Sequence, residues 1–491
     1  MSKAKTSKGT GAFRLLSFAL LTIFFIGIAL FDGPEWCKDS PSYESMDFSR
    51  EPVYPLFLML LRMACNAMGI TATPYDLAPH LTAAVLLQSL LWVGVIWYLG
   101  CFVYDISTRY LSEKKSLILS AIAMLSQVGV AVLNRFVANR GSMYSESIMT
   151  ESLAMPLFVF FTITLVKSLE NYNINACIAL ALQGILISSI RKQMLITLLM
   201  WGATSFVLHL FVKKYRSLQK FFMTFIAVIA AFVMIQGLDC VYNQAIRGVF
   251  TTHVGNSRGG LDTVLYTAEP EDAELFENAD PNEFPELKSL FTRIYDECQA
   301  RQLTIDYAPG YELGPDSNIL NSDWVAMVDH YAQSYDVIGF EIVLPMCDEY
   351  VAEHFPELDQ VHAQIKENQV EAKLLKVLMF DHIGDIFKGK DKGTWYVLSA
   401  NVVKAFVMSN ANIAPRILIT VSAVMYALFV AAMILMGMRR RPTFLLLGLV
   451  MILGLAINCV ITGSMIFPQP RYMCYSMGLF YLTLCCGILS Q

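Results

Sequence analysis

The sequence predicts an all-α polytopic membrane protein with about ten transmembrane helices, a juxtamembrane helix in the first outer loop and a mainly helical extracytoplasmic domain. The mean hydropathy is +0.50, and 55% of the 491 residues are hydrophobic whereas only 16% are charged. Apolar runs of about 20 residues, the length that crosses a bilayer as a helix, recur along the chain. This composition excludes an ordinary soluble globular domain.

The apolar runs define ten expected crossings. The basic pair Arg191 and Lys192 separates the fifth run from the sixth, and a Lys or Arg at the bilayer centre costs about 3 kcal/mol. We therefore expect a tight turn at this pair rather than one long helix. The expected crossings are 13–31, 80–104, 116–136, 148–168, 174–190, 193–212, 219–240, 413–437, 443–467 and 472–490.

The positions of Lys and Arg give an orientation. With the N-terminus inside, every inner segment before or between crossings is basic, as the positive-inside rule requires. We then expect a multi-pass protein of the plasma (inner) membrane with both termini cytoplasmic. The first run lacks a small-x-small cleavage site, so we interpret it as a retained signal anchor. The inner basic residues are Lys3, Lys5, Lys8, Arg14, Arg109, Lys114, Lys115, Lys167, Lys213, Lys214, Arg216, Lys220 and Arg439 to Arg441.

Three parts follow along the chain: an N-terminal transmembrane block at 1–240, whose first outer loop is 32–79, an acidic extracytoplasmic domain at 241–411 and a C-terminal transmembrane block at 412–491. The middle part holds 28 of the 41 acidic residues and 12 of the 36 Lys and Arg, a local net charge of −16. Its two cysteines, Cys298 and Cys347, could pair in an oxidising compartment, and the sequence leaves this open.

An apolar stretch within the first outer loop is too short to cross the membrane. It runs from Val53 to Met68 and begins with Pro52 and Pro55. A helix lying in the membrane interface suits this length. Such a helix would cover the polar patch that precedes it.

Acidic groups at the membrane edge are candidates for function, because polar groups there are costly unless satisfied. Asp39 lies in this polar patch with Tyr43 and Glu44, where an ordinary solvated loop is the other interpretation. Glu151 follows Thr150 at the outer end of the fourth crossing. Taken alone, that pair suits an N-terminal helix cap better than a site.

Basic residues at the outer face run against the positive-inside bias. Arg50 precedes the interfacial helix, Arg191 and Lys192 form the turn between crossings, and Arg471 enters the last crossing beside Tyr472. Snorkelling toward lipid headgroups is one explanation. The other is that several cations converge on one lipid-linked phosphate, since Arg and Lys form charge-assisted hydrogen bonds with phosphate oxygens.

A carboxylate beside cations at the outer interface fits sugar transfer from a membrane-bound phosphate donor. The carboxylate removes or orients the proton of the acceptor as it attacks the anomeric carbon. The cations stabilise the charge that develops on the leaving phosphate. The partners expected on this basis are a polyprenyl-phosphate-linked sugar, a glycan, lipid or protein acceptor, and the lipid bilayer, with no nucleic acid.

Several short motifs resemble the GT-C class of integral-membrane glycosyltransferases, which contains protein O-mannosyltransferases and lipid A aminoarabinose transferases. The resemblance covers the N-terminal half and the final helix, whereas 241–411 has no such motif. The motifs are "DSPSY" (39–43), "REPVYPLFL" (50–58), "SIMTESLAMPLFVF" (147–160), "GILISSIRKQML" (184–195) and "PRYMCYSMGLFYL" (470–482).

The resemblance implies a role for each matching residue. Asp39 would be the catalytic aspartate of the first loop, and Arg191, with Lys192 and Arg471, would bind the lipid phosphate. Cavity positions would fall on Tyr43, Glu44, Arg50, Tyr54, Glu151 and Tyr472. The chain has Ser40 where family members often carry a second acidic residue, and Lys192 where they carry Pro, and some members bind a divalent cation. Metal use and subfamily therefore stay open.

Two other functions compete with this interpretation. A polysaccharide polymerase or ligase of the cell envelope would rest on outer histidines such as His330, His354 or His382, which show no metal-ligand spacing. A transporter or flippase for lipid-linked sugars usually shows repeated halves and broken helices at mid-bilayer. The sequence shows no internal repeat, and its candidate polar groups gather at one face.

Overall fold

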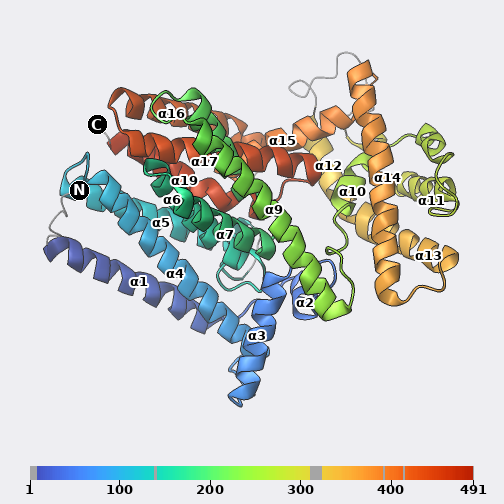
Figure 1. Ribbon diagram of the computed structural model, residues 1–491, viewed down its shortest axis with the longest axis horizontal. Helices are drawn as coiled ribbons and strands as arrows, with labels where there is room; N and C mark the ends of the chain where they lie inside the picture. The colour runs from blue at the N-terminus through green and yellow to red at the C-terminus, as the bar shows by residue number, and fades with distance from the viewer. Residues whose placement is uncertain (1–7, 138–140, 310–322, 391–392, 413–414, 490–491) are drawn as a thin grey trace. The chain divides into compact units, whose positions relative to one another are not determined.

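The computed structural model describes residues 8–137, 141–309, 323–390, 393–412 and 415–489, and the regular secondary structure in these parts of the chain is helical. The extended pairing in them is an isolated parallel bridge between Glu35 and Ser147. Figure 1 shows the helices in order along the chain. The chain divides into two compact units, the first being 1–252 with 408–458 and 470–491, and the second 253–407 with 459–469.

The first unit carries most of the apolar helices. Among the described residues, nine helical segments are long and apolar enough to cross a bilayer, which makes this a polytopic helical membrane protein. The fifth expected crossing, 174–190, is the shorter helix α7 (Ile174–Ile190). The nine segments are Thr10–Asp32, Pro79–Ser107, Glu113–Phe136, Glu151–Glu170, Lys192–Phe211, Leu218–Arg247, Leu418–Met438, Pro442–Met465 and Pro470–Leu489.

The chain breaks at Arg191, as the basic pair predicted. Helix α7 ends at Ile190, and Arg191 takes an extended conformation with φ −153° and ψ 121°. The chain then continues through a short 3₁₀ turn, Lys192–Leu195, into α8 (Ile196–Phe206).

Helix α4 (Pro79–Ser107) lies at the centre of the N-terminal helices (Figure 1). It packs against α1 (Lys8–Asp32), α3 (Val53–Ala67), α5 (Glu113–Val137) and α6 (Glu151–Glu170). The short helix expected in the first outer loop is therefore present as α3. Its apolar core contacts include Tyr54 and Leu58, which are fully buried.

The remaining helices of the first unit follow the expected runs with one extension. Helix α9 (Leu218–Arg247) continues seven residues past the predicted end at 240 and stops at Gly248, whose φ is +76°. At about 1.5 Å per residue it is about 45 Å long, more than a bilayer core. The C-terminal helices are α16 (Pro415–Met438), α17 (Pro442–Met465), α18 (Pro470–Met473) and α19 (Met477–Leu489).

The second unit is the mainly helical domain expected after the seventh crossing. Its longest helix, α14 (Gln360–Lys388), packs against α10 (Arg258–Tyr266) and α13 (Leu344–His354). Cys298 and Cys347 are free, buried thiols. The other helices are α11 (Leu287–Ala300), α12 (Trp324–Val337) and α15 (Thr394–Ala411), and α15 continues into the first unit.

Candidate functional site

The loop after α1 and the loop before α6 are tied together by their main chains. The Glu35 N–H donates to Glu146 O at 3.0 Å, and the Ile148 N–H donates to Glu35 O at 3.0 Å. Ser40 adds a side-chain link: its Oγ accepts from the Cys37 N–H at 2.7 Å and donates to Ile148 O at 2.9 Å. Ser40 thus holds the Asp39 loop against the loop that leads to Glu151.

Asp39 lies between two arginines from distant parts of the chain. Its Oδ1 is 3.0 Å from Nη2 of Arg50, and its Oδ2 is 2.9 Å from Nη1 of Arg471. Burial alone would raise the pKa of Asp39, but the charges of Arg471 and Arg50 outweigh it and hold that pKa at about 2. Asp39 is therefore a carboxylate at neutral pH, with each oxygen paired to a guanidinium.

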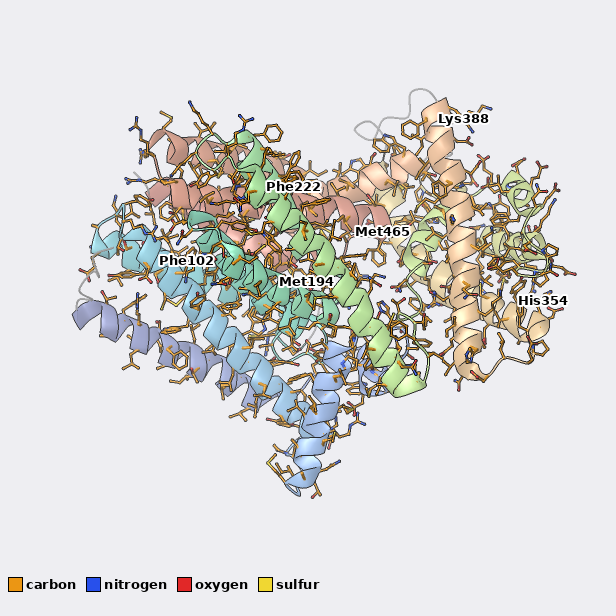
Figure 2. All side chains as sticks on the ribbon, in the orientation of Figure 1. Phe102, Met194, Phe222, His354, Lys388 and Met465 are labelled. Carbon is orange, nitrogen blue, oxygen red and sulfur yellow. The ribbon has the colours of Figure 1, made fainter. Side chains whose placement is uncertain are left out.

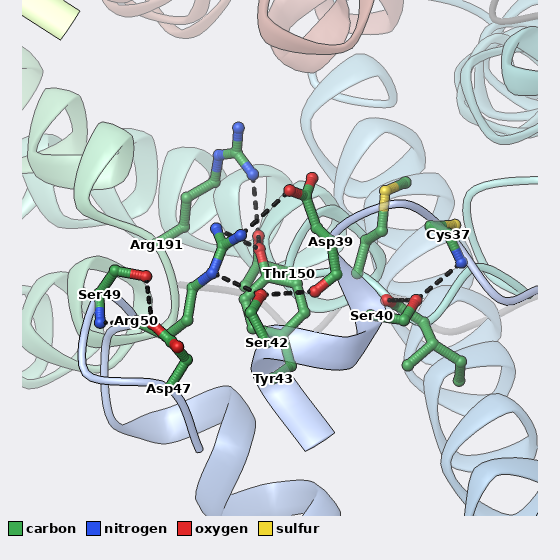
Figure 3. Close-up of polar contacts among 12 residues, drawn as sticks. Cys37, Asp39, Ser40, Ser42, Tyr43, Asp47, Ser49, Arg50, Thr150 and Arg191 are labelled. Atoms are coloured by element: carbon green, nitrogen blue, oxygen red, sulfur yellow. Dashed lines mark hydrogen bonds and ion pairs between the residues drawn. The ribbon is translucent and has the colours of Figure 1, made fainter. Parts of the chain in front are cut away.

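A second ion pair joins the start of α6 to the end of α7. Arg191 Nη1 lies 2.9 Å from Oε2 of Glu151 and donates to Thr150 Oγ1 at 2.8 Å. Arg471 reaches the same carboxylate, with its Nε 3.7 Å from Oε1 of Glu151. Glu151 is 1% exposed. Thus Asp39, Arg50, Glu151, Arg191 and Arg471 form one network, hereafter the arginine–carboxylate cluster (Figure 3 shows its Asp39, Arg50 and Arg191).

Thr150 does not act as the helix cap that the sequence favoured for it. It occupies the N-cap position of α6, but its side chain makes no cap hydrogen bond. Its Oγ1 instead donates to Oε2 of Glu151 at 3.2 Å and accepts from Arg191. The capping interpretation is therefore wrong, because the neighbouring ion pair takes the hydroxyl.

Two tyrosines flank the cluster. The Arg50 guanidinium lies 4.7 Å from the ring centre of Tyr43, and burial raises the pKa of Tyr43 to about 12. The Arg191 guanidinium lies 5.0 Å from the ring centre of Tyr472, whose hydroxyl accepts from Arg471 at 3.0 Å. Tyr43 and Tyr472, predicted as cavity residues, thus contact the arginines.

A proline in α6 leaves a backbone carbonyl available to anchor the start of this helix. Pro156 has no N–H, so the carbonyl of Ser152 one turn earlier lacks its helical partner. The indole N–H of Trp92 on α4 donates to that carbonyl at 2.9 Å. This contact anchors the first turn of α6, which carries Glu151, to the central helix.

Three other predicted residues contact groups outside the cluster. Glu44 pairs with Arg62 at 2.7 Å and with His80 at 3.0 Å. Tyr54 is fully buried and donates to Gln88 at 3.0 Å. For Lys192, the main-chain N–H donates to Oε1 of Glu51 at 2.7 Å.

Sequence reasoning missed a buried amide on α4. Gln88 is fully buried; its Oε1 accepts from Tyr54, and its Nε2 donates to the carbonyls of Ser145 and Ser147 at 3.1 and 3.3 Å. It therefore joins α3, α4 and the loop that precedes α6. A glutamine inside an apolar run is the signal that could have found it.

The side-chain amides of Gln193 and Asn458 support Arg191. Gln193 Oε1 accepts from Arg191 Nε at 3.1 Å, and its Nε2 donates to Asn458 Oδ1 at 3.0 Å. Asn458 in turn donates to the carbonyl of Tyr472 at 2.9 Å. These bonds fix Arg191 relative to the beginning of α18, where Arg471 lies.

The donor set does not fit a divalent cation. No group of three or more His, Cys, Asp or Glu in the described parts of the chain could hold a metal ion. Asp39 and Glu151 already pair with arginines, whose charges oppose a cation at the same oxygens. The cluster is instead suited to an anion, because its three arginines outnumber its two carboxylates.

Comparison of the chain with protein-family models, curated proteins and solved structures found no match.

Proposed function

We propose that the protein is a membrane glycosyltransferase that moves a sugar from a polyprenyl-phosphate donor to an extracytoplasmic glycan, lipid or protein. The observation that supports this most is the position of Asp39, whose two oxygens face Arg50 and Arg471 beside the Arg191–Glu151 pair. This is the reaction of the GT-C enzymes that the sequence motifs resemble. The active site would face the outer compartment.

The cluster has the charge for a phosphate ligand. Its five residues sum to one positive charge, and guanidinium groups bind phosphate oxygens with paired, charge-assisted hydrogen bonds. Arg191, Arg471 and Arg50 come from three separate segments, so a phosphate held by them would be contacted from more than one direction. All three arginines lie in loops or at helix ends. A phosphate bound there would leave the lipid tail of the donor in the bilayer.

In the proposed reaction, the acceptor hydroxyl attacks the anomeric carbon of the sugar. The new bond joins the acceptor oxygen to that carbon, and the bond from the carbon to the phosphate oxygen breaks. The leaving polyprenyl phosphate takes the bonding electron pair, and the arginines stabilise the charge it gains. Asp39 takes the proton of the acceptor hydroxyl as general base.

The ion pairs of Asp39 require an order of binding. A carboxylate with a pKa of about 2 and both oxygens paired is a weak base. A donor phosphate competes for Arg471 and Arg50, and each arginine that it takes leaves an Asp39 oxygen less stabilised and more basic. The donor therefore binds first and prepares Asp39 for the acceptor.

The polymerase alternative gains no support from its histidines. Nδ1 of His330 bonds to Tyr266 and its Nε2 to the carbonyl of Gln302. His354 bonds to the carbonyl of Tyr350. His382 is 1% exposed and bonds to Thr394 and Asp272. Each histidine thus has a local structural role in the second unit, for which we propose a part in holding or selecting the acceptor.

Mass spectrometry of the cell envelope tests the proposal. Cells lacking the gene should lose one sugar from an envelope glycan, lipid or protein and accumulate that sugar linked to polyprenyl phosphate. Restoring the gene should reverse both changes. Identical lipid-linked sugar pools with and without the gene would remove the proposed donor.

A further inference from the structure

The outward face of α14 changes character along the helix. Residues 18 and 25 apart in a helix lie on nearly the same face, so Gln369, Phe387 and His362 share one side. Toward the N-terminus this side carries exposed polar residues, namely His362, Gln369 and Lys376. Over the last three turns it carries Phe380, Ile383 and Phe387, which are 69%, 42% and 87% exposed.

The opposite side of the same turns is already used. Leu374, Leu378 and His382 are buried against the rest of the second unit. The three large apolar residues therefore point away from the core that α14 packs on. Several large apolar residues gathered on one exposed helix face are typical of a site that contacts a membrane or another protein. The change from Gln369 and Lys376 to phenylalanine indicates a change of surroundings near residue 380.

Cationic and aromatic residues border the apolar face. Lys376 lies one turn before Phe380, and Lys388 and Lys390 follow Phe387, all three with exposed side chains. Lys388 also pairs with Asp385 at 3.2 Å. Figure 2 labels Lys388 at the end of α14. Trp395, near the start of α15, is 61% exposed. Lysines beside phenylalanine and tryptophan are the composition of segments at the boundary between lipid headgroups and acyl chains.

The end of α14 is close in sequence to a membrane-spanning segment. Helix α15 follows a few residues later, and the next membrane-spanning segment begins at Leu418, 31 residues after Phe387. We infer that the last three turns of α14, through Phe380, Ile383 and Phe387, insert into the lipid interface while Lys376, Lys388 and Lys390 contact the headgroups. The second unit is thus anchored to the membrane at a point that is not a crossing. This inference is independent of the proposed function.

Spin labels on the full-length protein in lipid nanodiscs test the contact. Cys101, Cys240 and Cys485, which are partly exposed, are first replaced by serine. Single cysteines are then introduced as Phe380→Cys, Phe387→Cys and Gln369→Cys and labelled. Gln369→Cys is the matched control, because it lies on the same face about 27 Å from position 387. Power saturation compares collision with oxygen, which concentrates in lipid, and with a nickel chelate, which stays in water.

We expect the oxygen-to-nickel ratio at 380 and 387 to be severalfold higher than at 369. Equal ratios at the three positions would overturn the inference, since the apolar face would then lie in water. Low collision with both reagents at 380 and 387 would also overturn it and show that a protein surface covers the face. Unchanged unfolding temperatures of the labelled variants establish that each ratio reports the native fold.

Discussion

Asp39→Asn should separate donor binding from sugar transfer. The pKa of Asp39, lowered from 3.8 to about 2, corresponds to about 2 kcal/mol of net stabilisation of its charged form, after the charges of Arg471 and Arg50 have offset the cost of burial. The Asp39 side chain is only 27% exposed, so solvent screens this interaction incompletely. A donor phosphate must compete with it for Arg50 and Arg471. Asparagine is uncharged, so Arg50 and Arg471 would face the phosphate without competition from residue 39, and Glu151 would remain 3.7 Å from Arg471.

The expected effect has opposite signs in two assays. The affinity for polyprenyl phosphate should rise by up to about 30-fold, the equivalent of about 2 kcal/mol. The rate of sugar transfer should fall by roughly 10² to 10⁴-fold, the contribution of a general base. Binding is measured on purified protein in nanodiscs by isothermal titration with polyprenyl phosphate, and transfer by release of the carrier from the lipid-linked sugar.

Asp47→Asn is the matched control, because Asp47 lies exposed in the same loop and its carboxylate bonds to Ser49 at 2.9 and 2.6 Å. It should leave both quantities unchanged. Weaker binding of polyprenyl phosphate to the Asp39→Asn protein would refute the competition between phosphate and carboxylate. Full transfer activity of that variant would remove Asp39 from the chemistry.

Three further predictions follow from other contacts. Arg191→Lys keeps the charge but cannot hold Glu151, Thr150 and Gln193 together. It should raise the Michaelis constant for donor more than it lowers the rate at saturating donor. An unchanged Michaelis constant would reject the role of Arg191 in phosphate binding. Gln88→Leu should speed hydrogen exchange in residues 145–151 and slow transfer, because each buried hydrogen bond lost costs about 1–3 kcal/mol. The control is Gln127→Leu, which should do neither, because the Nε2 of Gln127 has no hydrogen-bond partner. Equal effects of the two substitutions would refute the linking role of Gln88. Burial raises the pKa of Glu146 to about 7, so the folded state binds this proton more tightly than the unfolded state does. Stability should therefore fall as pH rises from about 4.5 to about 7. Glu146→Gln should flatten this part of the curve of unfolding temperature against pH, and an unchanged curve would contradict the raised pKa of Glu146.

The helices were largely predictable because they follow from hydropathy alone. Runs of about 20 apolar residues became the crossings, and the Arg191–Lys192 pair marked the break between α7 and α8. Hydropathy did not predict the end of α9. The sequence becomes polar at Asp239 and Asn243, but the helical backbone hydrogen bonds continue to Arg247. The 17 residues of α7 show the opposite limit, since they fall short of a full crossing.

The members of the candidate site were predictable as residue types, but their pairing was not. The free-energy cost of polar groups at the membrane edge singled out Asp39, Glu151, Arg191 and Arg471, and these residues do meet. Nothing in spacing could pair Asp39 with a residue 432 positions away, or divert Glu44 to Arg62 and His80. Such pairings depend on how the helices pack. Window averages also hide single amides such as Gln88, because one polar residue barely changes the mean of an apolar run.

The most direct measurement of the central claim is the pool of lipid-linked sugars in cells that carry only the Asp39→Asn protein. We predict that mass spectrometry will find a polyprenyl-phosphate sugar accumulated to the level of gene-deleted cells, whereas cells with the Asp47→Asn protein will match wild type. A wild-type pool in the Asp39→Asn cells, with the protein present at normal abundance in the membrane, would contradict the account.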